Sequence, residues 1–127
     1  MSYPYNTGDV LTASDMNGLP VFTINAQTGT TYTAVSNDQY ARLVTMDNAA
    51  ANDFLIPTDA TINYPVGTVL NVYQKGAGVT TIKAVTAGTT TVVSAGATAA
   101  QPKLAQYKSA AAIKLAANSW VVVGGIV

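Results

Sequence analysis

The chain has 127 residues but contains no cysteine and no histidine, and every acidic residue is an aspartate. The lack of cysteine excludes a disulfide framework, a thiolate nucleophile and a sulfur-ligated metal. The lack of histidine removes the usual general base near neutral pH and the commonest transition-metal ligand. Without glutamate, a pair of carboxylates could come only from a few dispersed aspartates. We therefore expect neither an enzyme nor a protein that holds a metal or cofactor.

Charge is also scarce. Charged residues make up 9% of the chain, six basic and six acidic, so the net charge is zero. Ordinary soluble domains carry about 25% charged residues. The few Lys and Arg residues form no basic stripe, which excludes an electrostatic footprint for nucleic acid. Such a surface is either solvated by uncharged polar groups or covered by other chains, and of these two we favour a stable oligomer.

The chain shows no segment that would direct it to a membrane. Its first residues have neither the basic region nor the apolar region of a secretory signal. The longest strongly apolar run, residues 120–127, is too short to span a bilayer. We therefore expect a soluble protein that is made in the cytoplasm and has no membrane partner.

The length suits one domain with a genuine core, preceded by a different segment, residues 1–20. There the pattern is irregular, and residues 12–15 resemble a capping box for one helical turn that Gly18 and Pro20 would end. We interpret this segment as an extended arm that either folds back onto its own domain or docks on a neighbour. Its apolar anchors are Tyr3, Tyr5, Val10, Leu11, Met16 and Leu19.

In residues 21–127 the apolar residues alternate with the period of two that is typical of β-strands. The clearest unit is a hairpin, with one strand over 107–115, a turn at Asn118-Ser119 and a second strand from Trp120. Further strands are expected over 31–35, 40–46, 54–56, 68–75, 79–85 and 89–94. About seven to nine short strands with almost no helix predict an all-β domain, an antiparallel β-sandwich or barrel.

Three features could be mistaken for functional sites. Gly76-Ala77-Gly78 lies between two expected strands with no helix after it, which favours a hairpin turn over a phosphate-binding loop. The loop over 47–53 offers side-chain oxygens, but their spacing does not match a calcium loop. We interpret this segment as a solvated loop. The serines have no histidine to activate them, which argues against a serine nucleophile.

The aromatic residues allow two interpretations. Seven tyrosines and one tryptophan on a β framework could offer flat platforms to sugar rings. They also suit a core or a subunit interface, where a large apolar body and one polar tip are useful. We favour core or interface for Tyr64, Tyr73, Tyr107 and Trp120, and Tyr32 and Tyr40 stay open.

A series of short motifs extends along nearly the whole chain. In order, they occupy residues 8–17, 28–33, 40–48, 54–57, 64–68, 74–80, 106–107 and 118–124. In this order they resemble the β-module of tailed-bacteriophage virion proteins. That group includes capsid decoration or cement proteins, head or neck appendages, and tail fibres.

The resemblance implies a homotrimer of β-sandwich or barrel domains on the outside of a virion, without catalytic residues. An arm with a single β-domain favours a capsid decoration or cement protein, which binds the major capsid protein or other virion proteins and stabilises the shell. The alternative is a tail fibre or spike protein whose β-domain binds a receptor or a host-surface glycan. In both cases the protein is expected in the virion, after synthesis in the host cytoplasm.

Overall fold

The computed structural model describes residues 21–94 and 102–124, which form ten strands and one short 3-10 helix. The prediction of an all-β domain is confirmed. The expected arm, with its helical turn, lies outside the described residues. The elements are β1 (Thr23–Gln27), β2 (Thr31–Thr33), η1 (Ser36–Gln39), β3 (Arg42–Met46), β4 (Asn52–Ile56), β5 (Val69–Gln74), β6 (Thr80–Ala84), β7 (Thr91–Ser94), β8 (Lys103–Leu104), β9 (Ser109–Ala116) and β10 (Ser119–Gly124).

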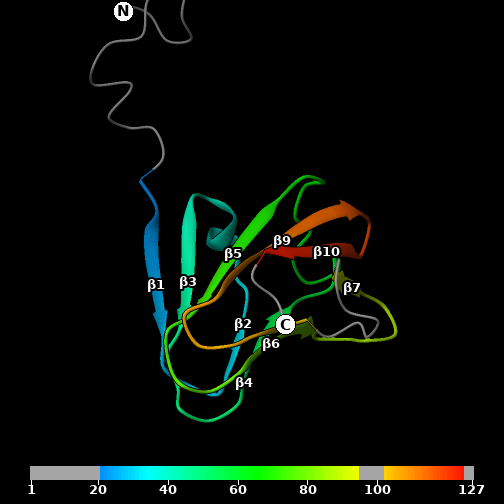
Figure 1. Cartoon of the computed structure of the whole chain (residues 1–127). Helices are drawn as coiled ribbons and strands as arrows, with labels where there is room; N and C mark the ends of the chain where they lie inside the picture. The colour runs from blue at the N-terminus through cyan, green and yellow to red at the C-terminus, as the bar shows by residue number, and fades with distance from the viewer. Residues whose placement is uncertain (1–20, 95–101, 125–127) are drawn as a thin grey trace, which may run out of the picture.

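Two sheets contain these strands. Sheet A has six, in the order β1-β3-β5-β9-β10-β7, and sheet B has four, in the order β2-β4-β6-β8. From β1 to β6 the chain alternates between the sheets, so each strand of sheet A leads to one of sheet B (Figure 1). Strands β1, β3 and β5 are parallel, as are β2, β4 and β6. The first six strands therefore form three turns of a flattened coil.

Among the later strands, β8 and β9 reverse direction, whereas β10 and β7 run the same way as β5. In sheet A, β9 pairs antiparallel with β5 and β10 pairs antiparallel with β9. In sheet B, β8 pairs antiparallel with β6. The predicted C-terminal hairpin is confirmed, and Asn118 in its turn has a φ of 50°. Asparagine tolerates this left-handed conformation better than most residues.

The antiparallel arrangement expected from the sequence is wrong for most of the pairings. Five of the eight pairings are parallel and three are antiparallel. A period of two determines which side chains share a face, and it is the same in both kinds of sheet. Strand direction depends on the connections instead. Here a strand of the opposite sheet provides the crossover that parallel neighbours require.

The loop Gly76-Ala77-Gly78 joins β5 to β6, which lie in different sheets, so the predicted hairpin at this position is wrong. The loop stacks on the previous turn of the coil, where the Gly78 N–H donates to the Asn48 carbonyl oxygen at 2.9 Å. A Cβ atom at Gly76 would collide with the backbone of Asn48, and one at Gly78 with that of Ala50. Glycine is needed here because two loops approach closely.

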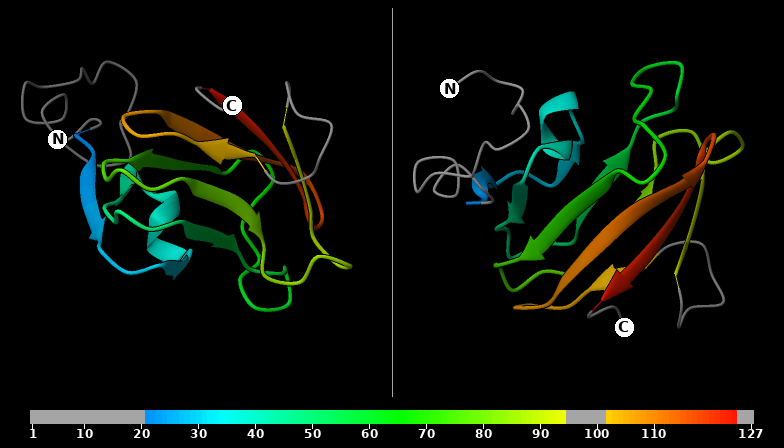
Figure 2. Two further views of the ribbon diagram at one scale, coloured as in Figure 1. Left: turned by 60° about the horizontal axis from the view of Figure 1, so that its bottom comes forward. Right: turned by 90° about the horizontal axis from the view of Figure 1, so that it is seen from above.

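The core lies between the two sheets. Figure 2 shows the two sheets from two further directions. Tyr64 and Trp120 meet edge to face at its centre, with ring centroids 5.6 Å apart. The Tyr64 hydroxyl donates to the Val35 carbonyl oxygen at 2.7 Å, so its polar tip is satisfied inside the core. The other large residues with no exposure include Phe54, Ile56, Met46, Leu70, Ile82 and Leu104.

Candidate functional site

The outward side of sheet A carries no charged side chain in its described strands. Inward residues such as Leu70 and Val72 are fully buried, and the residues between them face outward. Ile24 and Leu115 are more than half exposed, at 56% and 55%. We call this surface the uncharged face. The strand registers assign to it Ile24, Ala26, Leu43, Thr45, Val69, Asn71, Tyr73, Thr91, Val93, Ser109, Ala111, Ile113, Leu115, Ser119, Val121 and Val123.

A row of β-branched side chains crosses this face. Val69 lies beside Ile113, Ile113 beside Val121, and Val121 beside Val93. The row spans strands β5, β9, β10 and β7. Ile113 and Val121 are half-buried between their neighbours, whereas Val69 and Val93 are exposed. We call these four residues the ridge.

A shallow groove of about 350 Å³ runs beside the ridge. Along each shared strand it lies two residues from the ridge, where the registers align Asn71, Ala111 and Val123. The small side chain of Ala111 leaves a low floor between taller neighbours. The groove is lined by Phe22, Leu43, Asn71, Ser109, Ala110, Ala111, Val123 and Gly124.

The outward side of sheet B is chemically different. Asp53 on β4 and Lys83 on β6 form an ion pair at 3.2 Å, and each side chain is about one third exposed. Lys103 on β8 adds another cation. We call this surface the charged face, and its composition suits contact with water. The registers assign to it Thr31, Thr33, Asp53, Leu55, Thr81, Lys83 and Lys103.

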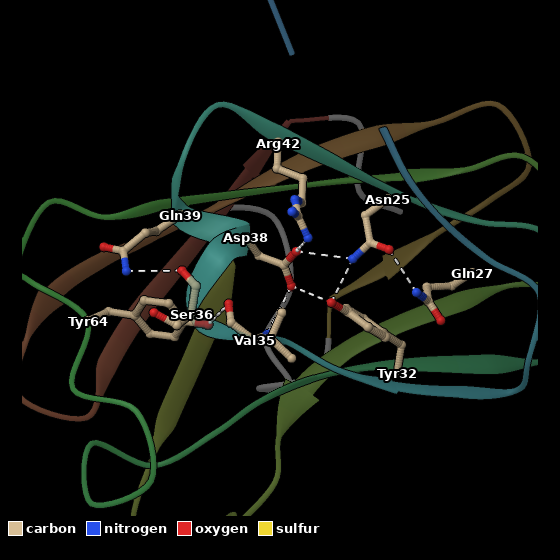
Figure 3. Close-up of polar contacts among 9 residues, drawn as sticks. All are labelled: Asn25, Gln27, Tyr32, Val35, Ser36, Asp38, Gln39, Arg42 and Tyr64. Atoms are coloured by element: carbon tan, nitrogen blue, oxygen red, sulfur yellow. Dashed lines mark hydrogen bonds and ion pairs between the residues drawn. The ribbon is translucent and has the colours of Figure 1, made fainter. Parts of the chain in front are cut away.

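Asp38, in η1, organises a buried polar network (Figure 3). Its carboxylate accepts hydrogen bonds from the Tyr32 hydroxyl at 2.6 Å, the Val35 N–H at 2.9 Å and the Asn25 amide at 3.1 Å. Arg42 lies 3.5 Å from the same carboxylate. Burial, together with the hydrogen bond to Asp38, raises the pKa of Tyr32 and keeps its phenol neutral. The network ties β1, β2 and β3 together, and its groups bond to one another.

A second buried polar group is Lys114, which lies on the inward side of β9 and is 2% exposed. Its ammonium donates to the Asp59 carboxylate at 2.8 Å, the Tyr64 carbonyl oxygen at 2.6 Å and the Asn63 side chain at 3.3 Å. Asp59 also accepts from the Asn118 N–H at 3.0 Å. The charge is thus compensated, and the contacts hold the β4–β5 connection against the C-terminal hairpin.

The structure separates the tyrosines that the sequence grouped as interface candidates. Tyr64 is 1% exposed and is therefore a core residue rather than an interface residue. Tyr73 lies half-buried on the uncharged face. Tyr107, in the turn before β9, is 68% exposed. The candidates that lie outside the described residues are Tyr3, Tyr5, Val10, Leu11, Met16 and Leu19.

The polar side chains of the loop between β3 and β4 make hydrogen bonds within the protein. The Asn48 side chain accepts from the Ala50 N–H at 2.8 Å and donates to the Thr28 carbonyl oxygen at 2.9 Å. The Asn52 amide donates to the Ala50 carbonyl oxygen at 3.0 Å, and Asp53 points to the charged face. Within residues 21–94 and 102–124, no cluster of three or more acidic, His or Cys side chains is suited to a metal.

The uncharged face is not among the sites predicted from the sequence. Its signal was present, because consecutive strands carry uncharged residues at alternate positions, for example Ala111, Ile113 and Leu115 in β9. Combining these positions into one surface requires knowing which strands share a sheet. That knowledge depends on the coil topology, which alternation does not reveal.

Comparisons with known proteins identify no relative of this chain. No family model matches the sequence, and no curated protein or solved structure shows significant similarity to the chain. Within the described part of the chain, no helix has the length and apolar character needed to cross a membrane. The surfaces of the molecule are therefore the basis for a functional proposal.

Proposed function

We propose that this chain is a structural protein of a tailed-bacteriophage virion. In this role it is a homotrimeric capsid decoration or cement protein that binds the particle exterior and stabilises the shell. The supporting observation is the contrast between the two outward faces of the sandwich. One face has no charged side chain, as suits burial against protein, and the other carries the Asp53–Lys83 ion pair and Lys103.

The physical mechanism of this role is burial at several contacts at once. A decoration protein that contacts several capsid subunits makes their separation cost the sum of those contacts. Its partners are copies of itself and the major capsid protein or other virion proteins. The segment of residues 1–20 is the proposed docking arm, with Tyr3, Tyr5 and Leu11 among its anchors.

Labelled particles test this proposal. Gold-conjugated antibodies against the chain are applied to intact and tail-less particles of a phage that encodes it. The proposal expects label on the heads of both preparations. Label confined to tails would support the fibre alternative instead. Particles without label on either part would refute a virion role.

The alternative, a receptor-binding or glycan-binding fibre domain, expects exposed tyrosines gathered at one end of the molecule. Tyr40 and Tyr107 are the strongly exposed tyrosines of the described residues. Tyr40 precedes β3, whereas the Tyr107 N–H donates to the carbonyl oxygen of Gln74, the last residue of the parallel strand β5. The two rings therefore lie at opposite ends of sheet A, and the geometry favours the decoration role.

A further inference from the structure

The uncharged face accepts a narrow range of partners. A partner with a charged surface would lose the hydration of its ionic groups and gain no opposite charge in return. A second copy of this chain brings an identical face, so no ionic group is buried by the contact itself. Contiguous apolar patches of this kind on a protein surface mark contact sites, whereas scattered single apolar residues do not.

The relief of the face fits a copy of itself. The ridge and the groove are parallel rows, about 7 Å apart along the strands. The ridge consists of stiff β-branched side chains, and the groove floor is formed around Ala111. Consider a second copy that faces the first with ridge on ridge. A shift of about 7 Å along the strands then places its ridge over this groove. The same face thus supplies both halves of a complementary contact.

The twist and size of sheet A are also suitable. In Figure 1 the strands turn from an upright β1 to a nearly level β10. Two copies share the same hand of twist, and sheets of the same hand pack face to face about 10 Å apart. With six strands, the face measures roughly 25 Å by 18 Å in projection. Two such faces cover about 900 Å² in projection, which is close to the lower end of specific protein–protein interfaces.

We infer that a second copy of this chain packs on the uncharged face, with the ridge of one copy against the groove of the other. The inference goes beyond the proposed function, because a face that packs on its own copy makes a two-fold contact, which joins chains or trimers in pairs but does not itself close a trimer. Val121 lies at the centre of this contact, since its neighbours in the ridge are Ile113 and Val93.

The test introduces one charge on each face of the full chain. Val121→Glu places a carboxylate in the ridge. Leu55→Glu is the matched control, because Leu55 is also half-buried and apolar and its neighbour on the charged face is Lys83. Sedimentation velocity at micromolar concentration measures the mass, and circular dichroism measures folding. The monomer mass is 13.0 kDa.

We expect the natural chain and Leu55→Glu to form the same oligomer. Val121→Glu should fold but associate about 100-fold more weakly, because an unpaired carboxylate would be buried in the contact. A natural chain that is monomeric would overturn the inference. An oligomer whose mass Val121→Glu leaves unchanged, or that Leu55→Glu disrupts equally, would overturn it as well.

Thiol labelling keeps the inference testable if Val121→Glu does not fold. The chain has no cysteine, so each introduced thiol is unique. Ala111→Cys in the groove and Thr81→Cys on the charged face are both at half-buried positions. In the assembled protein the thiol of Ala111→Cys should react with a maleimide at least about tenfold more slowly than the thiol of Thr81→Cys. Equal rates would mean that the groove is open and the inference is wrong.

The two proposals can fail separately. If the antibody label is absent from particles but association depends on Val121, the virion role is refuted and the self-association surface stands. If the heads are labelled but the association does not respond to Val121→Glu, the virion role stands and this surface is refuted.

Discussion

The two outward faces of the sandwich are built from strands with the same alternation, yet they differ in charge. Sheet B presents Asp53, Lys83 and Lys103, whereas sheet A presents no ionic side chain in its described strands. The chain as a whole has few charges, at 9% of its residues. The shortage of charged residues is therefore uneven, and it is greatest on the outward side of the larger sheet.

The contrast between the faces depends on the crossings of the chain between the sheets, and the loop from β5 to β6 is one of these crossings. Gly78 permits this crossing, since any Cβ there would collide with the backbone of Ala50. We predict that Gly78→Ala lowers the free energy of unfolding by about 3 kcal/mol, the cost of forcing stacked loops apart. Urea denaturation measures this change.

Gly88→Ala is the control for that prediction. A Cβ at Gly88 meets no atom within 4 Å. This variant should therefore lower the free energy of unfolding by less than about 0.5 kcal/mol, or raise it slightly. If the two alanine variants were equally stable, the close approach of the two loops would not require glycine at position 78.

A second prediction concerns the tyrosines between the faces. Burial raises the pKa of Tyr32 and of Tyr64 in the folded state, whereas an unfolded tyrosine loses its proton near pH 10. Above about pH 10 the folded state therefore binds more protons than the unfolded state. The stability is complete below that pH and falls as the pH rises further.

Urea unfolding between about pH 9 and pH 11.5 tests this dependence. Tyr32→Phe and Tyr64→Phe should each reduce the steepness of the fall, although each also loses a hydrogen bond at neutral pH, to Asp38 or to the Val35 carbonyl oxygen. A slope that neither substitution changes would contradict the assignment to these two residues.

The smallest effect is expected on the charged face. Lys83→Met removes the ion pair with Asp53, in which both side chains are about one third exposed. Exposed pairs contribute little, so the free energy of unfolding should change by less than about 0.5 kcal/mol. A double-mutant cycle with Asp53→Asn measures the coupling. A coupling above about 2 kcal/mol would mean that this face has a structural role beyond contact with water.

The sequence was sufficient for the local parts of the fold. The hairpin of β9 and β10 could be predicted because its strands are adjacent in sequence and Asn118 suits a turn, although the turn was expected at Asn118-Ser119 and lies one residue earlier, with Ser119 already in β10. The position of the Gly76-Ala77-Gly78 loop was also predictable. Its role was not, because the atoms that require glycine belong to a loop about 28 residues earlier in the chain, at Asn48 and Ala50.

The orientation of β9 shows why the candidate site could not be found in the same way. One side of this strand carries Lys114, and the other carries the apolar Ile113 and Leu115. From charge alone, one would predict that the side of the lysine faces water. The structure buries Lys114 instead, because Asp59 and a backbone carbonyl compensate its charge. Asp59 lies 55 residues away, and only the complete fold brings it to this position.

Because the chain winds through both sheets, the size of the protein depends on the number of windings. One more winding inserted before β5 would widen each sheet by one strand and leave the C-terminal hairpin as it is, in the manner of a repeat protein. Strands β8 and β9 act as terminators, since their reversed direction offers the next winding no parallel neighbour. The described part of the molecule is thus a short coil that β8 and β9 terminate on one side, and longer versions of the same design are physically accessible.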